Sequence, residues 1–387
     1  MKFGTLATHG VALVALAYAL RAATFNRSWL RIPVVRDLPD APLVSILVPA
    51  RNEERSIEGC IRSLLAQSAP QIEVIAIDDR STDATLAILE RLAASDARLT
   101  IVRGAELPAG WVGKPWALHQ GAARARGRWL LFTDADSVHA TFSVSSVLAF
   151  ARASSSDAVT ISTLQELGSL AERIVLPSIL GLIFFASGSF ETLNDPTLPD
   201  RALANGQYIF ISREAYDALG GHASVRDRIV EDVELARHLK RDGRFRLTIA
   251  GGEELASVRM YHSLGEIWTG FTKNMYFGAE GRWDRLLGGF VFLSTISIAP
   301  PLLALNALAK RRPIEALEAL AASAATMATA GWAMSAVRLD RRLGWFQPLG
   351  TAVMAAIIVN STARILSGRG VQWRGRTYGG GSGGGTR

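Results

Sequence analysis

The stretch W-L-L-F-T-D-A-D-S-V, residues Trp129–Val138, decides how the rest of the chain is interpreted. It begins as an apolar run typical of a buried strand and ends in two carboxylates, Asp134 and Asp136, separated by Ala135. At the end of a strand, where the chain turns, two such carboxylates can reach the same side. Hard oxygen ligands of this kind suit Mg²⁺ or Mn²⁺ bridging phosphate oxygens. An isolated Asp-x-Asp is better explained as a solvated turn, so the surrounding sequence has to decide.

The composition indicates an enzyme with membrane helices. Of 387 residues, 49% are hydrophobic, the mean hydropathy is +0.19 and the net charge is +7. That charge would suit nucleic acid, anionic lipid or phosphorylated substrates. Because the basic residues are scattered along membrane flanks without a reading module, we expect no nucleic-acid partner. The single cysteine, Cys60, excludes an intrachain disulfide framework, favours a reducing compartment and is expected in the core.

Four apolar segments are candidates for membrane spans. The first, from about Thr8 to Thr24, is followed by basic residues, and a cleaved signal peptide is its rival interpretation. Three more, each about the length a bilayer requires, follow Trp283. They are residues Leu286–Ala309, Ala316–Val337 and Phe346–Leu366. One N-terminal and about three C-terminal transmembrane helices are therefore expected, as domains 1–26 and 286–368.

Four spans conflict with the distribution of positive charge. They would place Lys310-Arg311-Arg312, and also Arg374 and Arg376, on the side opposite the central domain, against the positive-inside tendency. Pro300-Pro301 could instead make the first C-terminal segment re-entrant. Both arrangements stay open. Residues 379–387 have the composition of a linker or tag remnant and are excluded from the predicted fold.

The central region, from Leu43 to about Leu255, alternates β-rich runs with helical segments, which predicts an α/β sheet flanked by helices. Leu170–Phe190 is apolar but contains Pro177, and a helix in the membrane interface or lining a lipid-facing groove fits it better than a full span or a buried core helix. The expected strands are Val44–Val48, Ile72–Ile77, Leu99–Val102, Trp129–Thr133 and Ala158–Thr163. The expected helices are Glu54–Gln67, Asp83–Ala94 and Pro115–Ala125.

Five motifs, in a fixed order between Val44 and Trp283, give these elements a family likeness. They are V-S-I-L-V-P-A-R-N-E-E (Val44–Glu54), I-A-I-D-D-R-S-T-D-A-T (Ile75–Thr85), G-K-P-W-A-L-H-Q-G (Gly113–Gly121), D-A-D (Asp134–Asp136) and I-V-E-D-V-E-L-A-R-H-L-K-R (Ile229–Arg241). Together they resemble the membrane-bound family-2 inverting glycosyltransferases, which have a GT-A fold. The likeness is greatest to hopanoid, carotenoid and ceramide-type members, and Val371–Tyr378 adds to it. Arg80 departs from the family pattern, which has a glycine there.

The resemblance implies a nucleotide-sugar donor site at the strand ends, which in open α/β sheets form the ligand crevice. Asp79 is expected to bind the base and Glu53 the nucleoside, and a UDP-sugar is the favoured donor. Asp78 could equally be a structural carboxylate, and Lys114 either holds the donor phosphate or sugar or is a solvated lysine at a helix start. Donor-binding residues are expected to be Pro49, Ala50, Asn52, Glu53, Asp78, Asp79, Lys114, Asp134 and Ala135, with Mg²⁺ or Mn²⁺ on Asp134, Asp136 and, more weakly, His262.

The resemblance also implies an acceptor side and a catalytic base. In an inverting transfer one carboxylate takes the proton of the attacking acceptor hydroxyl, and Asp232 is the choice here. Of the family's Q-x-x-R-W box only Arg282-Trp283 is present, with Ala279 at the glutamine position. Acceptor-side residues are expected to be Asn205, Gly206, Gln207, Glu231, Arg282 and Trp283.

The expected protein is thus a multi-pass enzyme of a bacterial-type plasma membrane. Its GT-A catalytic domain, residues 43–285, faces the cytoplasm and includes interfacial helices near 170–190 and 264–283. It moves one sugar to a lipid acceptor drawn from the bilayer. A processive polysaccharide synthase is an alternative, but it predicts more spans and an intact Q-x-x-R-W box. A non-catalytic nucleotide-sugar sensor or scaffold would need the donor site but not Asp232.

Overall fold

The computed structural model describes residues 3–25, 30–69, 71–278, 282–367, 369–373 and 376–380. The chain forms two compact units. The α/β unit consists of Trp29–Glu166 and Phe190–Met260. The helical unit consists of Met1–Ser28, Leu167–Ser189 and Tyr261–Ser382, so the segments near 170–190 and 264–283 group with the membrane helices.

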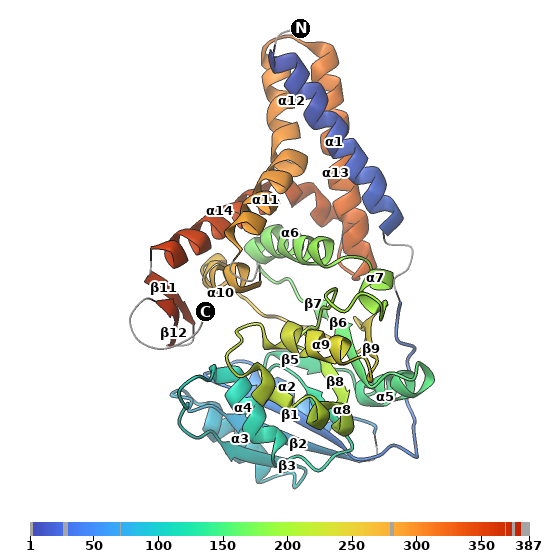
Figure 1. Ribbon diagram of the computed structural model, residues 1–387, viewed down its shortest axis with the longest axis vertical. Coiled ribbons are helices and arrows are strands. Elements are labelled where there is room, and N and C mark those ends of the chain that lie inside the picture. Colours follow the sequence, from blue (N-terminus) through green and yellow to red (C-terminus); the bar gives the residue numbers. More distant parts are fainter. Residues whose placement is uncertain are drawn as a thin grey trace. The chain divides into compact units, whose positions relative to one another are not determined.

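A seven-stranded sheet with the order β3-β2-β1-β4-β8-β6-β9 is the centre of the α/β unit (Figure 1). The first four strands along the chain pair in parallel, whereas β8 is antiparallel to both of its neighbours. The strands are β1 (Val44–Ala50), β2 (Ile72–Asp78), β3 (Leu99–Arg103), β4 (Trp129–Phe132), β6 (Ala158–Ser162), β8 (Ile209–Ser212) and β9 (Leu247–Gly251). All five strands expected from the sequence are confirmed within two residues.

Helices cover both faces of this sheet, which explains why its central parallel strands β1, β2 and β4 are mostly apolar and buried on both sides. Along β1, Ile46 and Val48 pack in one core while Leu47 packs in the other, as the two-residue period of a strand requires. On the first face lie α2 (Ile57–Leu65), α3 (Thr85–Ala93) and α5 (Ser143–Ala153). On the second lie α4 (Gly113–Ala122), α7 (Phe190–Asn194), α8 (Arg213–Ala218) and α9 (Glu231–Asp242).

A small second sheet begins directly after Asp136 and fixes the turn that carries the carboxylates. Its strand order is β5-β10-β7, with β5 (Ser137–His139), β10 (Ala256–Val258) and β7 (Leu164–Gln165). Across the turn, Thr133 Oγ1 lies 2.9 Å from His139 Nε2, and both side chains are buried. The D-A-D segment is therefore held at both ends.

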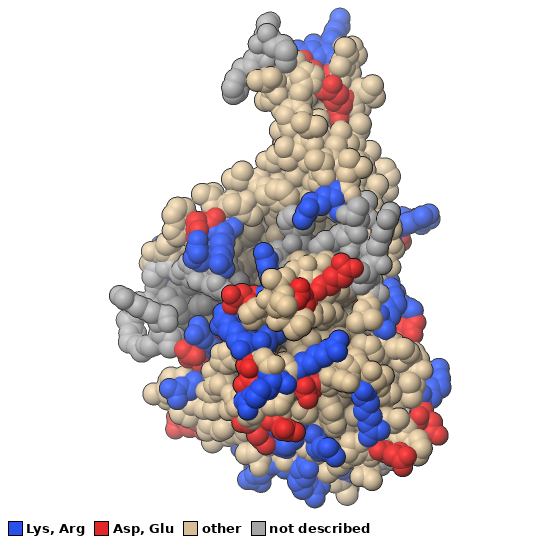
Figure 2. Space-filling view, turned by 45° about the vertical axis from the view of Figure 1, so that its right-hand side comes forward, with Lys and Arg blue, Asp and Glu red and all other residues tan. Residues whose placement is uncertain are grey.

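The helical unit has three helices long and apolar enough to cross a membrane, among the residues described: Thr5–Ala22, Trp283–Ala309 and Arg341–Arg364. On the face shown in Figure 2, the surface of this unit is largely uncharged. Its helices are α1 (Phe3–Phe25), α6 (Leu170–Ser187), α10 (Leu264–Gly278), α11 (Trp283–Leu293), α12 (Ala299–Ala309), α13 (Pro313–Ala336) and α14 (Gln347–Leu366). One N-terminal and two C-terminal candidates match the expected membrane helices. The Ala-, Ser- and Thr-rich α13 is outside this set, so a third C-terminal span stays a prediction.

Pro300-Pro301 does not interrupt its helix. A π-helical stretch, Ser294–Ile298, connects α11 to α12 and precedes the two prolines, which lack the N–H that an α-helix uses. At the C-terminus, β11 (Arg369–Trp373) and β12 (Arg376–Gly380) form a hairpin, so the first two residues of the expected linker belong to a strand. Ala279, Arg374 and residues 381–387 lie outside the described residues.

Candidate active site

The carboxyl ends of β1, β2 and β4 bring most of the expected donor-binding residues to one edge of the sheet. Ala50 pairs with Asp78, and the Asp79 N–H donates to Ala50 O at 2.8 Å. Because β4 runs parallel to β1 in the same sheet, the D-A-D segment leaves the sheet at this edge. Both Asp78 and Asp79 are buried.

The loops after β1 and β2 are tied together by side-chain contacts. Asn52 adopts the left-handed conformation, with φ 56°, and its Oδ1 accepts from Thr82 N at 2.8 Å. Asn52 N in turn donates to Ser81 Oγ at 3.1 Å. Arg51 Nη1 donates to Asp79 O at 2.7 Å. The two loops therefore form one wall, with the Asp79 carboxylate held beside a guanidinium.

Arg80 occupies the position where the family pattern has glycine, and its φ is 58°. Only glycine reaches this left-handed region without steric cost. The turn geometry that the family's glycine would allow is thus retained here, with an arginine carrying the strain.

Lys114, in the first turn of α4, is the centre of a charge cluster. Its Nζ lies 2.7 Å from Asp134 Oδ1 and 3.0 Å from Glu231 Oε1. Burial alone would lower the pKa of this lysine. The nearby carboxylates of Asp134, Glu231 and Asp232 outweigh that effect and hold its pKa well above the usual value. Lys114 is therefore a half-buried, doubly paired cation joining the end of β4 to the start of α9, and its role in donor binding stays a prediction.

Asp136 has the features of a carboxylate that binds a cation. Its Oδ1 is buried and has no hydrogen-bond partner among the described residues. Burial, together with the charges of Asp134 and Glu53, raises the pKa of Asp136 to about 7. A buried polar atom without a partner calls for an explanation, and a divalent cation held by Asp134 and Asp136 would supply one.

The donor set fits a hard divalent ion that also binds substrate. No group of three or more His, Cys, Asp or Glu side chains among the described residues is arranged to hold a metal by itself. Mg²⁺ is commonly held by only one or two carboxylates, with phosphate oxygens and water completing its shell. Asp134 and Asp136 can supply that much. His262 lies in the helical unit, where its backbone N–H donates to Glu266 at 2.8 Å, so its role as a ligand stays a prediction.

Asp232, in the first turn of α9, is held by two backbone N–H groups. Its Oδ2 accepts from Gly206 N at 2.9 Å and its Oδ1 from Val233 N at 2.8 Å. Burial and the neighbouring Glu231 raise the pKa of Asp232 to about 6, against the opposing charge of Lys114. A carboxylate with this pKa is a stronger base near neutral pH than an ordinary aspartate.

Of the three expected acceptor-side residues on the segment before β8, only Gly206 reaches the charge cluster. A Cβ on Gly206 would lie 2.8 Å from Lys114 Nζ and 3.1 Å from Asp232 Oδ2. The Asn205 side chain donates to Ile161 O at 3.0 Å, and Gln207 Oε1 accepts from Thr163 at 2.5 Å. The polar side chains on either side thus bind to β6 and its end, and they position the glycine backbone.

The sequence did not indicate that Cys60 lies directly beneath the D-A-D segment. Its buried Sγ is 3.6 Å from Asp134 O. Burial, and then the charges of Asp136, Asp134 and Glu53, raise the pKa of this thiol. Cys60 is therefore an inert packing residue, as expected, but one that supports the floor of the site. The other two expected acceptor-side residues, Arg282 and Trp283, lie in the helical unit, where Arg282 pairs with Asp284 at 2.6 Å.

Residues 45–220, which include the sheet strands β1, β2 and β4 and the D-A-D segment, match the model of Glycosyl transferase family 2. The resemblance found in the sequence is thereby confirmed. Among known proteins, the chain is 26% identical over 357 residues to a 4,4'-diaponeurosporenoate glycosyltransferase of Staphylococcus aureus, with 87% of this chain and 88% of that protein covered.

A solved structure shows the same fold. The mannosyltransferase PcManGT from Pyrobaculum calidifontis, in complex with GDP-Man and Mn²⁺, superposes with a TM-score of 0.52. The match has 20% identity and covers 94% of this chain and 98% of that one. This likeness supports a GT-A fold accompanied by helices outside the sheet.

Proposed function

We propose that this protein transfers a single sugar, with inversion, from a nucleotide-diphosphate sugar to a membrane lipid. A UDP-sugar is the proposed donor and Mg²⁺ or Mn²⁺ the proposed cofactor. The reaction takes place at the cytoplasmic face of a bacterial-type plasma membrane. The observation that carries this proposal is the cluster of Lys114, Asp134, Glu231 and Asp232 around the Gly206 backbone, beside the unpartnered Oδ1 atom of Asp136.

Each residue of the cluster has a separate task in the proposed reaction. Asp134 and Asp136 would hold the divalent ion, which when bound neutralises charge on the leaving diphosphate. Lys114 adds a second cation aimed at the same phosphate oxygens, and Glu231 fixes its position. The walls formed by Asn52, Glu53, Asp78 and Asp79, with Pro49 and Ala50 behind them, would bind the nucleoside.

Asp232 is the proposed general base. The acceptor oxygen attacks the anomeric carbon from the side opposite the diphosphate, its proton passes to the Asp232 carboxylate, and the bond from carbon to the diphosphate oxygen breaks. The Gly206 and Val233 N–H groups hold both carboxylate oxygens in place. The raised pKa of Asp232 suits it to accept this proton.

The proposed acceptor is an apolar lipid with a hydroxyl or carboxyl group. Two observations support it: the Staphylococcus aureus relative is a 4,4'-diaponeurosporenoate glycosyltransferase, and three helices of this chain are long and apolar enough to cross a membrane. A processive synthase would need more spans than the three candidates found among the described residues. Their number therefore favours transfer of one sugar over processive export of a polymer.

Incubation of the purified protein with radiolabelled UDP- and GDP-sugars, divalent cation and a total lipid extract tests the proposal. We expect one sugar to enter one lipid, identified by mass, with UDP-sugars preferred and transfer lost in chelator. Label in a polymer would favour a synthase. Donor binding without transfer to any lipid would favour the sensor alternative. Undiminished turnover in chelator would show that transfer does not require a metal ion.

A further inference from the structure

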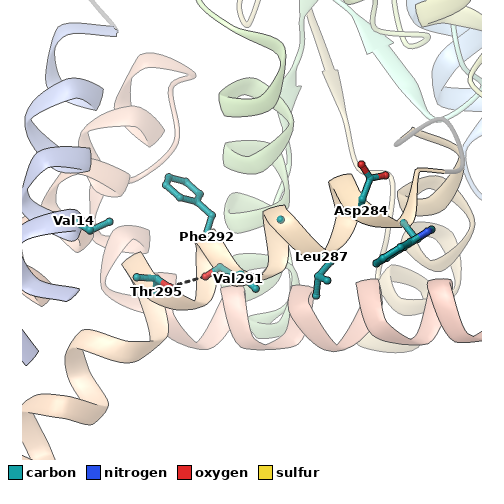
Figure 3. Close-up of a pocket in the computed structure, with 8 residues that line it drawn as sticks. Val14, Asp284, Leu287, Val291, Phe292 and Thr295 are labelled. Carbon is teal, nitrogen blue, oxygen red and sulfur yellow. Dashed lines mark hydrogen bonds between the residues drawn. The ribbon is translucent and has the colours of Figure 1, made fainter. Parts of the chain in front are cut away.

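An open groove of about 590 Å³ runs between α1 and α11 within the helical unit. Figure 3 shows Val14 on α1 opposite Phe292 and Thr295, with Leu287 and Asp284 further along α11. The rings of Tyr18 on α1 and Phe292 on α11 pack edge to face, with centroids 5.7 Å apart, and join the two helices beside the groove.

The groove lies on surface that is apolar and faces outward. Val14 belongs to the candidate span Thr5–Ala22 and the remaining lining residues belong to Trp283–Ala309. Leu287 and Val291 are each about half exposed, at 51% and 53%. Large apolar side chains that stay exposed on a helix of this kind are typical of contact with lipid hydrocarbon. The groove is therefore open to the membrane interior.

Polarity changes along the length of the groove. Trp283 and Asp284 lie at one end, and the Asp284 carboxylate pairs with Arg282. At the other end, the Thr295 hydroxyl donates to Val291 O at 2.8 Å, so its polar atom is already satisfied within the helix. From Trp283 to Thr295 the helix rises about 18 Å, more than half of a hydrocarbon core of about 30 Å. The groove thus has one polar end and an apolar remainder.

Gly288 gives the groove its depth. A Cβ at this position would meet no heavy atom within 4 Å, and the same is true of Gly289. Neither glycine is therefore required for close packing of helices, although glycine weakens a helix. Only Gly288 lines the groove. A side chain at Gly288 would fill the groove, whereas one at Gly289 would not.

We infer that this groove binds the apolar chain of the acceptor lipid, with the polar head of that lipid at the Trp283–Asp284 end. This inference rests on the proposed function. The occupant is one long hydrocarbon or polyene chain, because this open groove is single and has one polar end. The Asp284 carboxylate, compensated by Arg282, makes that end polar, and the amphipathic ring of Trp283 suits the membrane boundary.

The first experiment compares Gly288→Leu with the matched control Gly289→Leu, using the full-length protein in nanodiscs. With the long-chain acceptor, Gly288→Leu is expected to raise KM at least about tenfold while Gly289→Leu stays within about twofold of wild type. With a short-chain analogue of the same head, both variants should match wild type. Equal KM values for the two variants on the long-chain acceptor would overturn the inference.

The second experiment detects a lipid chain bound in the groove independently of catalysis. A long-chain alkyl alcohol with a mid-chain diazirine is photolysed in the same nanodiscs, and labelled peptides are mapped by mass spectrometry. We expect label on residues 283–295, reduced by Gly288→Leu and competed by total lipid extract but not by added phosphatidylglycerol. Label competed equally by phosphatidylglycerol would mean ordinary bilayer lipid, and absence of label would mean no chain site. Either result overturns the inference.

The two experiments separate this inference from the proposed function. Specific, competed labelling without transfer of any sugar would leave a chain-binding groove on a protein that is not the proposed transferase. Transfer of sugar to lipid, with no effect of Gly288→Leu and no label in the groove, would support the proposed transferase and contradict the groove as its lipid-binding site.

Discussion

At the scale of single residues, the proposed chemistry depends on how Asp232 is held. Its two carboxylate oxygens each accept from a backbone N–H near the Lys114 ammonium, and an asparagine there keeps the shape and one of these bonds but cannot take a proton. We expect Asp232→Asn to bind donor normally and to lose transfer by roughly 10²–10⁴-fold. Calorimetric titration with donor and a transfer assay measure the two effects, and a near-wild-type rate would identify another base.

The pH dependence of transfer follows from the same residue. Asp232 has to be deprotonated to accept a proton, and its pKa is raised to about 6. Because the deprotonated fraction falls as pH drops through the pKa, kcat/KM is expected to be flat near pH 8 and to fall about tenfold per unit well below about pH 6. Initial rates at saturating metal across this range check it. A profile with no limb near that pKa would contradict the assignment.

Gly206 lies so close to Lys114 and Asp232 that no side chain fits there without displacing them. A Cβ there would press on the end of the Lys114 side chain at 2.8 Å and on the Asp232 carboxylate at 3.1 Å. We expect Gly206→Ala to lower kcat by at least about tenfold, because Lys114 and Asp232 must move apart, with little change in thermal unfolding. Gly59→Ala, where a Cβ meets nothing within 4 Å, is the matched control and should keep full activity.

What the sequence could reveal at this scale was the identity of the acidic residues but not their pairing. The D-A-D segment and the E-D pair at Glu231-Asp232 stand out as motifs at element ends. That Lys114 bridges Asp134 and Glu231 depends on β4, α4 and α9 meeting in space, and no local pattern carries that information. Likewise, Asn205 and Gln207 are polar residues beside a glycine in the sequence. Only the structure shows that they anchor to the β6 side and leave the glycine backbone to face the cluster.

At the scale of elements, prediction from the sequence succeeded where burial gave a long, uniform pattern. Strands β1, β2 and β4 are largely apolar and buried along almost their whole length because helices cover both of their faces. The strands β5, β7 and β10 have two or three residues each, too short for any period to show. Strands β8 and β9 were not predicted either, and they complete the sheet on the side away from the donor-binding loops.

The turn after β2 offers a test of backbone strain at the element scale. Arg80 has φ 58°, and its ion pair with Glu106, at 3.9 Å between exposed groups, stabilises little. We expect Arg80→Gly to leave the free energy of unfolding unchanged or raise it by up to about 1 kcal/mol, since strain is relieved and chain entropy partly offsets it. Arg80→Val should lower it by about 1–2 kcal/mol, because a β-branched residue is least compatible with this conformation. Chemical denaturation of both variants measures the difference in the free energy of unfolding. Equal values for the two variants would contradict backbone strain at Arg80.

At the scale of the whole molecule, packing within the helical unit bears on how the chain crosses the membrane. Helices α1, α12 and α13 run side by side (Figure 1), and polar contacts such as Thr5 Oγ1 to Glu315 at 2.9 Å join α1 to α13. In contrast, α14 packs mainly on α6 and α10. Length and composition favour α14 as a span over α13, whereas packing favours α13.

If α1, α11–α12 and α13 are the helices that cross, the conflict over positive charge becomes smaller. With the catalytic unit in the cytoplasm, Lys310-Arg311-Arg312 lies outside, while Arg338, Arg341, Arg342 and the residues after α14 lie inside. In a Cys60→Ala background, we expect single cysteines at Lys310 to react with an impermeant thiol reagent in intact cells, and those at Arg338 and Ser367 only after permeabilisation. A cysteine at the exposed Glu106 is the cytoplasmic reference. Labelling of Ser367 in intact cells would establish α14 as a further span and restore the four-span arrangement, with the charge of the C-terminal hairpin on the outer side.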